Sequence, residues 1–173
     1  MGNQLRLEKF EVGDLDRLLS WIDSPRTMYL FGGSLFEYPV TSEQLDKYVL
    51  AENRLIYKVV EETTLEVIGH AELNLIDFKN RSARICRIII GDQSSRNKGY
   101  GKAIIRSLIH IGFNELKLHR LDLGVYDFNM QAINCYKACG FEIEGLLKEN
   151  IRVGEEYWST YNMSLLNTEL IRS

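Results

Sequence analysis

The segment SSRNKGYGKA, residues 94–103, combines two glycines with three cationic side chains and follows the apolar run ICRIIIG, residues 85–91, after two residues. The apolar run predicts a strand, and the apolar spacing after Lys102 predicts a helix. A glycine-rich turn between a strand and a helix directs backbone N–H groups and the positive end of the helix dipole at one point. Arg96, Lys98 and Lys102 add positive charge there. The segment therefore predicts a site for a phosphate group.

Two familiar phosphate-binding loops are excluded by the residues at named positions in and just after this segment. A Walker A loop needs a glycine near Arg96 and a hydroxyl residue at Ala103, and a dinucleotide-binding fingerprint needs glycine or alanine at Ile104. The pattern that remains is Arg-x-x-Gly-x-Gly, with Arg96, Gly99 and Gly101 in the three named places. Plain turns also contain such a pattern, so it gains a function only together with a second motif.

The second motif lies downstream in NMQAINCYKACGF, residues 129–141. Asn129, Ala132, Ile133 and Tyr136 follow one another at i, i+3, i+4 and i+7, which places them on one face of a helix. A glycine, Gly140, ends that helix. Tyr136 on this face presents its hydroxyl to a ligand, or it is an amphipathic core residue with its hydroxyl at the rim. The spacing leaves both interpretations open.

The remaining pattern predicts one mixed α/β domain over residues 1–173, in the order β-α-α-β-β-β-α-β-α-β-β. Residues 24–39, which hold several aromatic side chains, two glycines and both prolines, are expected to form a loop or broken helix. The predicted strands cover 4–10, 54–62, 66–77, 84–91, 119–126, 141–153 and 157–166, and the predicted helices cover 12–22, 41–50, 102–116 and 130–140.

Composition excludes several classes of partner. The formal net charge of −3 gives no general attraction to nucleic acid or to anionic membranes, and no apolar run approaches membrane-spanning length. The three cysteines cannot all pair within the chain, which favours a reducing compartment and hence the cytoplasm. Histidines 70, 110 and 119 lack HxxH or HExxH spacing, so no metal site is expected.

Taken together, RNKGYG, the strand HRLDLGV and NMQAINCYKACGF resemble the GNAT family of N-acetyltransferases. The segments FNELKLHRLDLGV and GFEIEGLLKENIRVGEEY are similar to the branch that contains ribosomal-protein N-terminal acetyltransferases and spermidine acetyltransferases. The resemblance implies an α+β fold with a mostly antiparallel mixed sheet flanked by helices, and acetyl-CoA as cosubstrate. It also implies that the loop binds the coenzyme A pyrophosphate and that the preceding strand pairs with pantetheine. The matching positions are Ile88, Ile89, Ile90, Arg96, Asn97, Lys98, Gly99, Tyr100 and Gly101.

The same resemblance implies catalytic roles. Asn129 maps to a position beside pantetheine or an active-site water, and Tyr136 maps to the acid that protonates the departing thiolate. A phenol with a pKa of about 10 is protonated at neutral pH and can donate. Relatives often carry a carboxylate base on the strand before the loop, but Arg84, Ile85 and Arg87 stand there in this chain. Glu72 is the substitute candidate for the base, although solvated strand glutamates are commoner.

The missing strand carboxylate determines the expected acceptor. Without a dedicated base, an α-amine with a pKa near 8 supplies more neutral nucleophile than an amine with a pKa near 10.4. We therefore expect a protein or peptide N-terminus, or a small weakly basic amine, as acceptor. A spermidine acetyltransferase and a non-catalytic acyl-CoA sensor are the alternatives, and a homodimer is left open.

Overall fold

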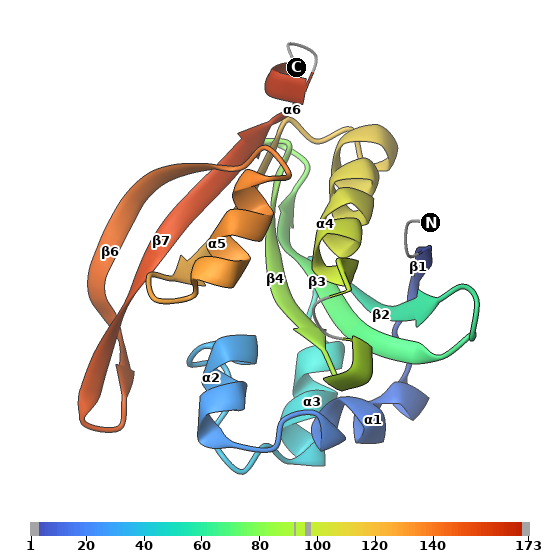
Figure 1. Ribbon diagram of the computed structural model, residues 1–173, viewed down its shortest axis with the longest axis vertical. Helices are drawn as coiled ribbons and strands as arrows, with labels where there is room; N and C mark the ends of the chain where they lie inside the picture. Colours follow the sequence, from blue (N-terminus) through green and yellow to red (C-terminus); the bar gives the residue numbers. More distant parts are fainter. Residues whose placement is uncertain (1–3, 92, 96–97, 171–173) are drawn as a thin grey trace.

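The structure of the protein, a computed structural model, describes residues 4–91, 93–95 and 98–170. Seven strands form one sheet in the order β1-β2-β3-β4-β5-β7-β6 (Figure 1). All neighbours are antiparallel except β4 and β5, which are parallel. The strands are β1 (Leu5–Lys9), β2 (Leu55–Glu61), β3 (Val67–Asp77), β4 (Ser82–Ile90), β5 (Arg120–Tyr126), β6 (Glu142–Val153) and β7 (Glu156–Leu166).

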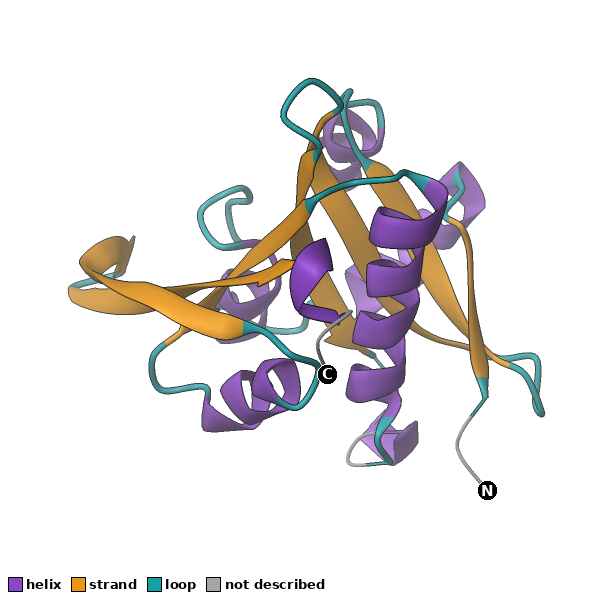
Figure 2. Ribbon diagram, turned by 90° about the horizontal axis from the view of Figure 1, so that it is seen from above, coloured by secondary structure: helices purple, strands orange, loops and turns teal. Residues whose placement is uncertain are grey.

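Helices lie on both sides of the sheet (Figure 2). The main hydrophobic core contains side chains of α4, α5 and the sheet, and a second hydrophobic core contains side chains of α1, α2 and α3. Beyond His110, α4 continues as a π-helical segment. The helices are α1 (Leu15–Ser20), α2 (Pro25–Gly32), α3 (Ser42–Val49), α4 (Tyr100–His110), α5 (Met130–Lys137) and the single turn α6 (Asn167–Leu170).

The predicted mixed sheet flanked by helices is confirmed, and the structure adds α2 and α6 to the predicted order. The aromatic segment that was expected to be a loop or broken helix contains α2. Pro25 occupies the first turn of α2, where its missing N–H is not needed, and the Ser24 hydroxyl accepts from the Thr27 N–H at 3.1 Å. Glycines 32 and 33 then end the helix. Local capping thus outweighs the glycine and proline content that suggested a loop.

The parallel pairing between β4 and β5 ends halfway along β4. The register of β4 with β5 runs from Ser82 to Ile85 and stops there, although β4 continues to Ile90. On its other side β4 stays paired with β3, where the register shifts between His70 and Glu72. That shift is a bulge, and Arg87 within it has a positive φ of 50°. The sheet therefore opens between the second half of β4 and β5.

Candidate active site

The predicted phosphate loop leads into the N-terminus of α4. Gly99 is the N-cap of this helix. Its φ is +83°, a backbone conformation that residues with a Cβ adopt only with strain. Tyr100 begins the helix and is buried, whereas Lys98 is exposed. Arg96 and Asn97 lie outside the described residues. The described part of the loop therefore matches a helix N-terminus with cationic flanks, which is the arrangement that a pyrophosphate requires.

Space for an incoming group is available at Gly101. A Cβ at this position would meet only the Cys135 Sγ, at 3.7 Å, which is an ordinary van der Waals contact. Packing within the protein would therefore allow a side chain at position 101. A bound pyrophosphate that approaches the α4 backbone closely would use this space, so the loop fits coenzyme A.

The strand positions that the resemblance assigns to pantetheine lie in the open half of β4. Ile88 and Ile90 pack against the main core, and Ile89 packs against the second core, so their side chains alternate across the sheet. The backbone of this segment lies beyond the last β4–β5 pair. A ligand with amide groups could pair with the β4 edge in the opening.

The second motif is a helix whose N-cap is Asn129. The Asn129 Oδ1 accepts from the Ala132 N–H at 3.2 Å, and Ile133 anchors α5 in the main core. Tyr136 lies one turn further along, half-buried, with its ring 6.3 Å from that of Phe141. Asn129 thus starts and orients the helix that carries Tyr136.

Burial, and to a smaller extent the nearby thiols Cys135, Cys86 and Cys139, raise the pKa of Tyr136 above its ordinary value. The phenol is therefore protonated throughout the neutral range. Cys86 follows Ile85, the last β4 residue paired with β5. The influence of the Cys86 thiol on Tyr136 indicates that Tyr136 lies near the point on β4 at which the pairing with β5 ends.

Cys135 on α5 and Cys139 just after α5 differ in exposure. Cys139 is buried and Cys135 is half-buried next to Gly101. A hydrogen bond with Cys139, and then the charge of Lys102, lower the pKa of Cys135 below its ordinary value. The Cys135 side chain therefore packs against the first turn of α4, and this contact explains where the thiol lies.

Glu72 is not solvated, because its side chain is 0% exposed in a cluster of buried polar groups. Its Oε2 accepts from the Tyr48 hydroxyl at 2.5 Å and from Arg87 Nη1 at 2.8 Å, and its Oε1 lies 3.5 Å from Arg54 Nη1. His70 adjoins the cluster, with Nε2 3.2 Å from the Tyr48 hydroxyl. Burial lowers the pKa of His70 to about 4, so this imidazole is neutral at pH 7.

Both arginines that stand in place of the expected strand carboxylate form ion pairs with carboxylates. Arg87 pairs with Glu72, and Arg84 pairs with Asp122 and donates to Asn162 Oδ1 at 3.1 Å. Tyr48 and Arg54, which reach Glu72 from other elements, were not predicted from the sequence. The residue types carried no signal for this, since only the fold brings α3 and the chain before β2 against β3.

Replacing Glu72 with glutamine should lower the free energy of unfolding by about 3–5 kcal/mol, because two buried guanidinium groups would lose their counter-charge. Urea unfolding followed by circular dichroism measures this. Glu8→Gln on β1, a partly exposed carboxylate, is the matched control and should change the stability by less than about 1 kcal/mol. A Glu72→Gln protein that keeps its stability but loses turnover would instead assign Glu72 as the base.

An aromatic box lies at the N-terminal end of α5. It consists of Tyr126 at the end of β5, Phe128 just before α5, and Trp158 on β7, with ring centroids 5.0–5.4 Å apart. The Tyr126 hydroxyl donates to the Tyr29 carbonyl at 3.0 Å and so ties the box to α2. The aromatic residues around α2 are visible in the sequence, but their proximity to Phe128 and Trp158 was not predicted.

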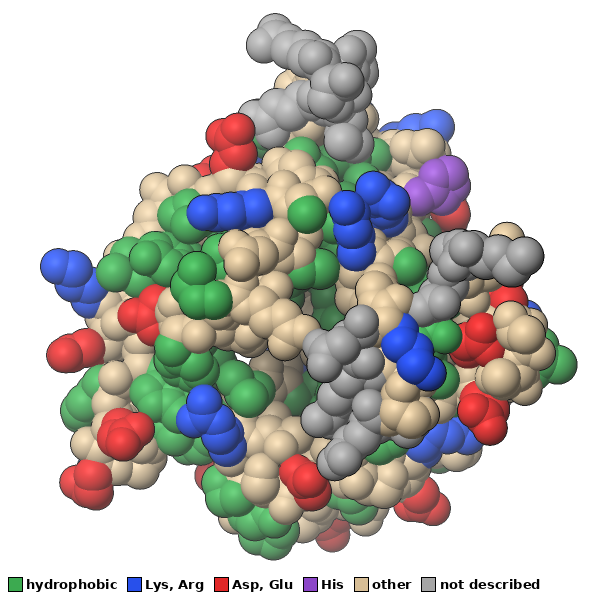
Figure 3. Space-filling view, in the orientation of Figure 1, with side chains coloured by type: hydrophobic (Ala, Val, Ile, Leu, Met, Phe, Trp, Pro, Cys, Tyr) green, Lys and Arg blue, Asp and Glu red, His purple; other side chains and the backbone are tan. Residues whose placement is uncertain are grey.

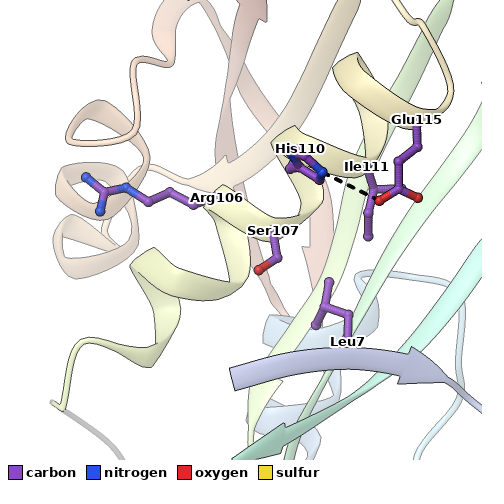
Figure 4. Close-up of a pocket in the computed structure, with 6 residues that line it drawn as sticks. All are labelled: Leu7, Arg106, Ser107, His110, Ile111 and Glu115. Carbon is purple, nitrogen blue, oxygen red and sulfur yellow. Dashed lines mark ion pairs between the residues drawn. The ribbon is translucent and has the colours of Figure 1, made fainter. Parts of the chain in front are cut away.

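Two shallow depressions lie along α4, and Tyr136 lines neither of them. One, of about 370 Å³, is lined by Leu7, Arg106, Ser107, His110, Ile111 and Glu115, with His110 and Glu115 3.8 Å apart (Figure 4). Arg106 points away from Ser107 and Leu7 in this view. The other, of about 440 Å³, reaches Lys98, Gly99 and Lys102 at the start of α4. Only the second adjoins the predicted phosphate loop.

Two further properties concern the described part of the chain. Its His, Cys, Asp and Glu side chains include no group of three that could hold a metal ion. None of its helices is both long and apolar enough to cross a bilayer.

Comparison with known proteins identifies the family. The acetyltransferase (GNAT) family profile matches residues 16–141. The spermidine N(1)-acetyltransferase of Vibrio cholerae serotype O1 is 30% identical over 99% of this chain and 98% of its own. The L-amino acid N-acetyltransferase of Escherichia coli K12 is 30% identical over 74% of this chain and 79% of its own.

The fold comparison agrees with the sequence comparison. A crystal structure of spermidine N-acetyltransferase from Vibrio cholerae, in complex with CoA and spermine, superimposes with a TM-score of 0.85 at 26% identity. The match covers 97% of this chain and 98% of that one. The chain belongs to the acetyltransferase (GNAT) family and is an acetyl-CoA-dependent N-acetyltransferase.

Proposed function

We propose that the protein transfers the acetyl group of acetyl-CoA to a primary amine of a polyamine such as spermidine. The observation that carries this proposal is the similarity to a spermidine N(1)-acetyltransferase over 99% of the chain. It replaces the expectation of a peptide N-terminus as the leading acceptor. The aromatic box agrees with it, since aromatic faces attract ammonium groups.

The chemistry proposed at the site is direct transfer. The neutral amine attacks the thioester carbonyl, the new C–N bond forms, and the C–S bond breaks with departure of the thiolate. Tyr136 donates its hydroxyl proton to the sulfur, and its raised pKa keeps that proton available. The attacking nitrogen releases one proton to water as the amide forms, and a proton from water restores the Tyr136 phenol. Asn129 holds the start of α5 and thereby the position of Tyr136.

The proposal gives the cosubstrate two binding elements. Backbone groups at the start of α4 and the loop residues Arg96, Asn97, Lys98, Gly99, Tyr100 and Gly101 take the pyrophosphate. The edge of β4 at Ile88, Ile89 and Ile90 takes the pantetheine amides. These assignments are supported by the glycine geometry of the loop and by the early end of the β4–β5 register.

A weakly basic amine, including a peptide N-terminus, is the second candidate acceptor. It is favoured by the state of Glu72, whose charge is offset by Arg54 and Arg87. Glu72 as general base stays a prediction, and a site with no free base would use the amine that ionises least.

Rates with a panel of amines decide between the candidates. We expect the kcat/KM for spermidine to exceed the values for Ala- and Ser-initiated peptides and for free L-amino acids by at least about tenfold, equivalent to ~1.4 kcal/mol. Release of free thiol from acetyl-CoA, measured at matched amine concentrations, provides the readout. A peptide or amino acid that outperforms spermidine would overturn the polyamine proposal and leave the acetyl transfer intact.

Location and assembly complete the proposal. A cytoplasmic protein is supported by its three cysteines, none of which is in a disulfide. A homodimer is supported by β6, a long edge strand with Ile143, Leu146 and Leu147 exposed, because edge strands readily pair with a second chain.

A further inference from the structure

The aromatic box already holds a cation of the protein itself. The guanidinium carbon of Arg26 on α2 lies 5.3 Å from the centre of the Phe128 ring and 5.4 Å from that of Trp158. Both distances are within the range of cation–π attraction. Arg26 is exposed, and no carboxylate of the described residues forms an ion pair with it. The contact therefore depends on the ring faces and can be exchanged for another cation.

The rings are held in place independently of Arg26. Phe128 and Tyr126 are stacked at an interplanar angle of 4°, and Trp158 stands nearly perpendicular to both, at 82° and 85°. The Tyr126 hydroxyl is anchored to α2, and the Trp158 Nε1 donates to Glu156 Oε2 at 3.2 Å. The Phe128 side chain is 42% exposed, so the box is open to solvent. Glu156 adds a negative charge beside it.

The box lies at a useful distance from Tyr136. Phe128 precedes α5, and Tyr136 is six residues beyond the first helical residue, Met130, or about 9 Å of helix rise. On the face shown in Figure 3 the surface is hollowed between α5, α4 and α2. The box lies at the start of α5 and at the adjacent ends of β5 and β7, next to α2. An extended polyamine with its reacting amine near Tyr136 has a length comparable to this separation.

We propose that Tyr126, Phe128 and Trp158 form a subsite for a second, non-reacting ammonium group of the acceptor, and that Arg26 is the resident cation displaced from it. This inference rests on the proposed polyamine function. Arg26 competes with the acceptor for the same ring faces, whereas a monoamine leaves Arg26 in place. The box thus selects acceptors that carry a second positive charge.

Kinetics of two variants with two amines test the subsite. Phe128→Leu keeps an apolar side chain but removes a ring face, and it should raise the KM for spermidine about 3- to 30-fold. Arg26→Ala should lower that KM by about threefold or more. In both variants the KM for n-butylamine and for acetyl-CoA should stay within twofold of wild type.

Matched controls separate the box from general effects. Tyr157→Leu alters the exposed aromatic neighbour of Trp158, whose side chain points to the other face of β7, and Arg6→Ala removes a positive charge on β1. Both should leave the KM for spermidine unchanged. An Arg26→Ala protein with a higher KM for spermidine would make Arg26 a structural clamp. Equal effects of either box variant on the two amines would also overturn the subsite.

A binding measurement distinguishes failure of the subsite from failure of the proposed function. If wild type acetylates neither amine, the polyamine function is wrong, and calorimetric titration of spermidine then tests the box alone. Weaker spermidine binding by Phe128→Leu than by wild type or Tyr157→Leu would support the subsite. Equal affinity in all three proteins would refute it.

Discussion

Replacing Tyr136 with phenylalanine is expected to lower kcat by about 10²–10⁴-fold, the range associated with loss of a general acid. The substitution removes one hydroxyl and keeps the ring that packs against Phe141. Acetyl-CoA affinity should therefore be preserved. Because burial raises the pKa of Tyr136, the wild-type phenol remains protonated at alkaline pH and its donor function is retained there.

Stopped-flow kinetics of thiol release measures the turnover, and calorimetry measures the affinity for acetyl-CoA. Together they show whether the substitution changes turnover alone. Tyr161→Phe is a matched control, since Tyr161 also packs on the main core and takes no proposed part in the reaction. It should leave kcat unchanged. A Tyr136→Phe protein with wild-type kcat, under conditions in which the chemical step limits the rate, would return Tyr136 to a packing role.

The second large effect is expected at the start of α4. Gly101→Val places a branched side chain where the pyrophosphate should approach the backbone. Steric intrusion of this kind costs about 1–3 kcal/mol, or roughly 5- to 150-fold in the Kd for acetyl-CoA. The protein itself accommodates a Cβ at Gly101, with only the Cys135 sulfur in contact. Unfolding free energy should therefore change by less than about 1 kcal/mol.

Calorimetry of acetyl-CoA binding and urea unfolding of the same samples measure both quantities. Gly145→Val on β6 is the matched control, since a Cβ there meets open space. It should leave the Kd for acetyl-CoA unaltered. A folded Gly101→Val protein that binds acetyl-CoA as tightly as wild type would remove this loop from the cosubstrate site.

Periodicity along the sequence determined most of the secondary structure. The alternation of the meander strands and the apolar spacing of α4 and α5 were sufficient to predict these elements, because residues a few positions apart already define the buried face. The glycine loop and the Asn129–Tyr136 helix face were also local signals. Residues 24–39 were the exception, since glycine and proline content obscured the capped helix α2.

Tertiary structure alone decided how these pieces meet. The hydrogen bond between Tyr48 and Glu72 joins residues 24 positions apart, and the hydrogen bond between Tyr126 and Tyr29 joins residues 97 positions apart. No periodicity encodes such partners, because they depend on strand order and on the helices that cover each face. The same holds for the early end of the β4–β5 register, which opens the sheet beside Tyr136. Residue types thus specified the chemistry available to this protein, and long-range packing specified which of those groups share a site.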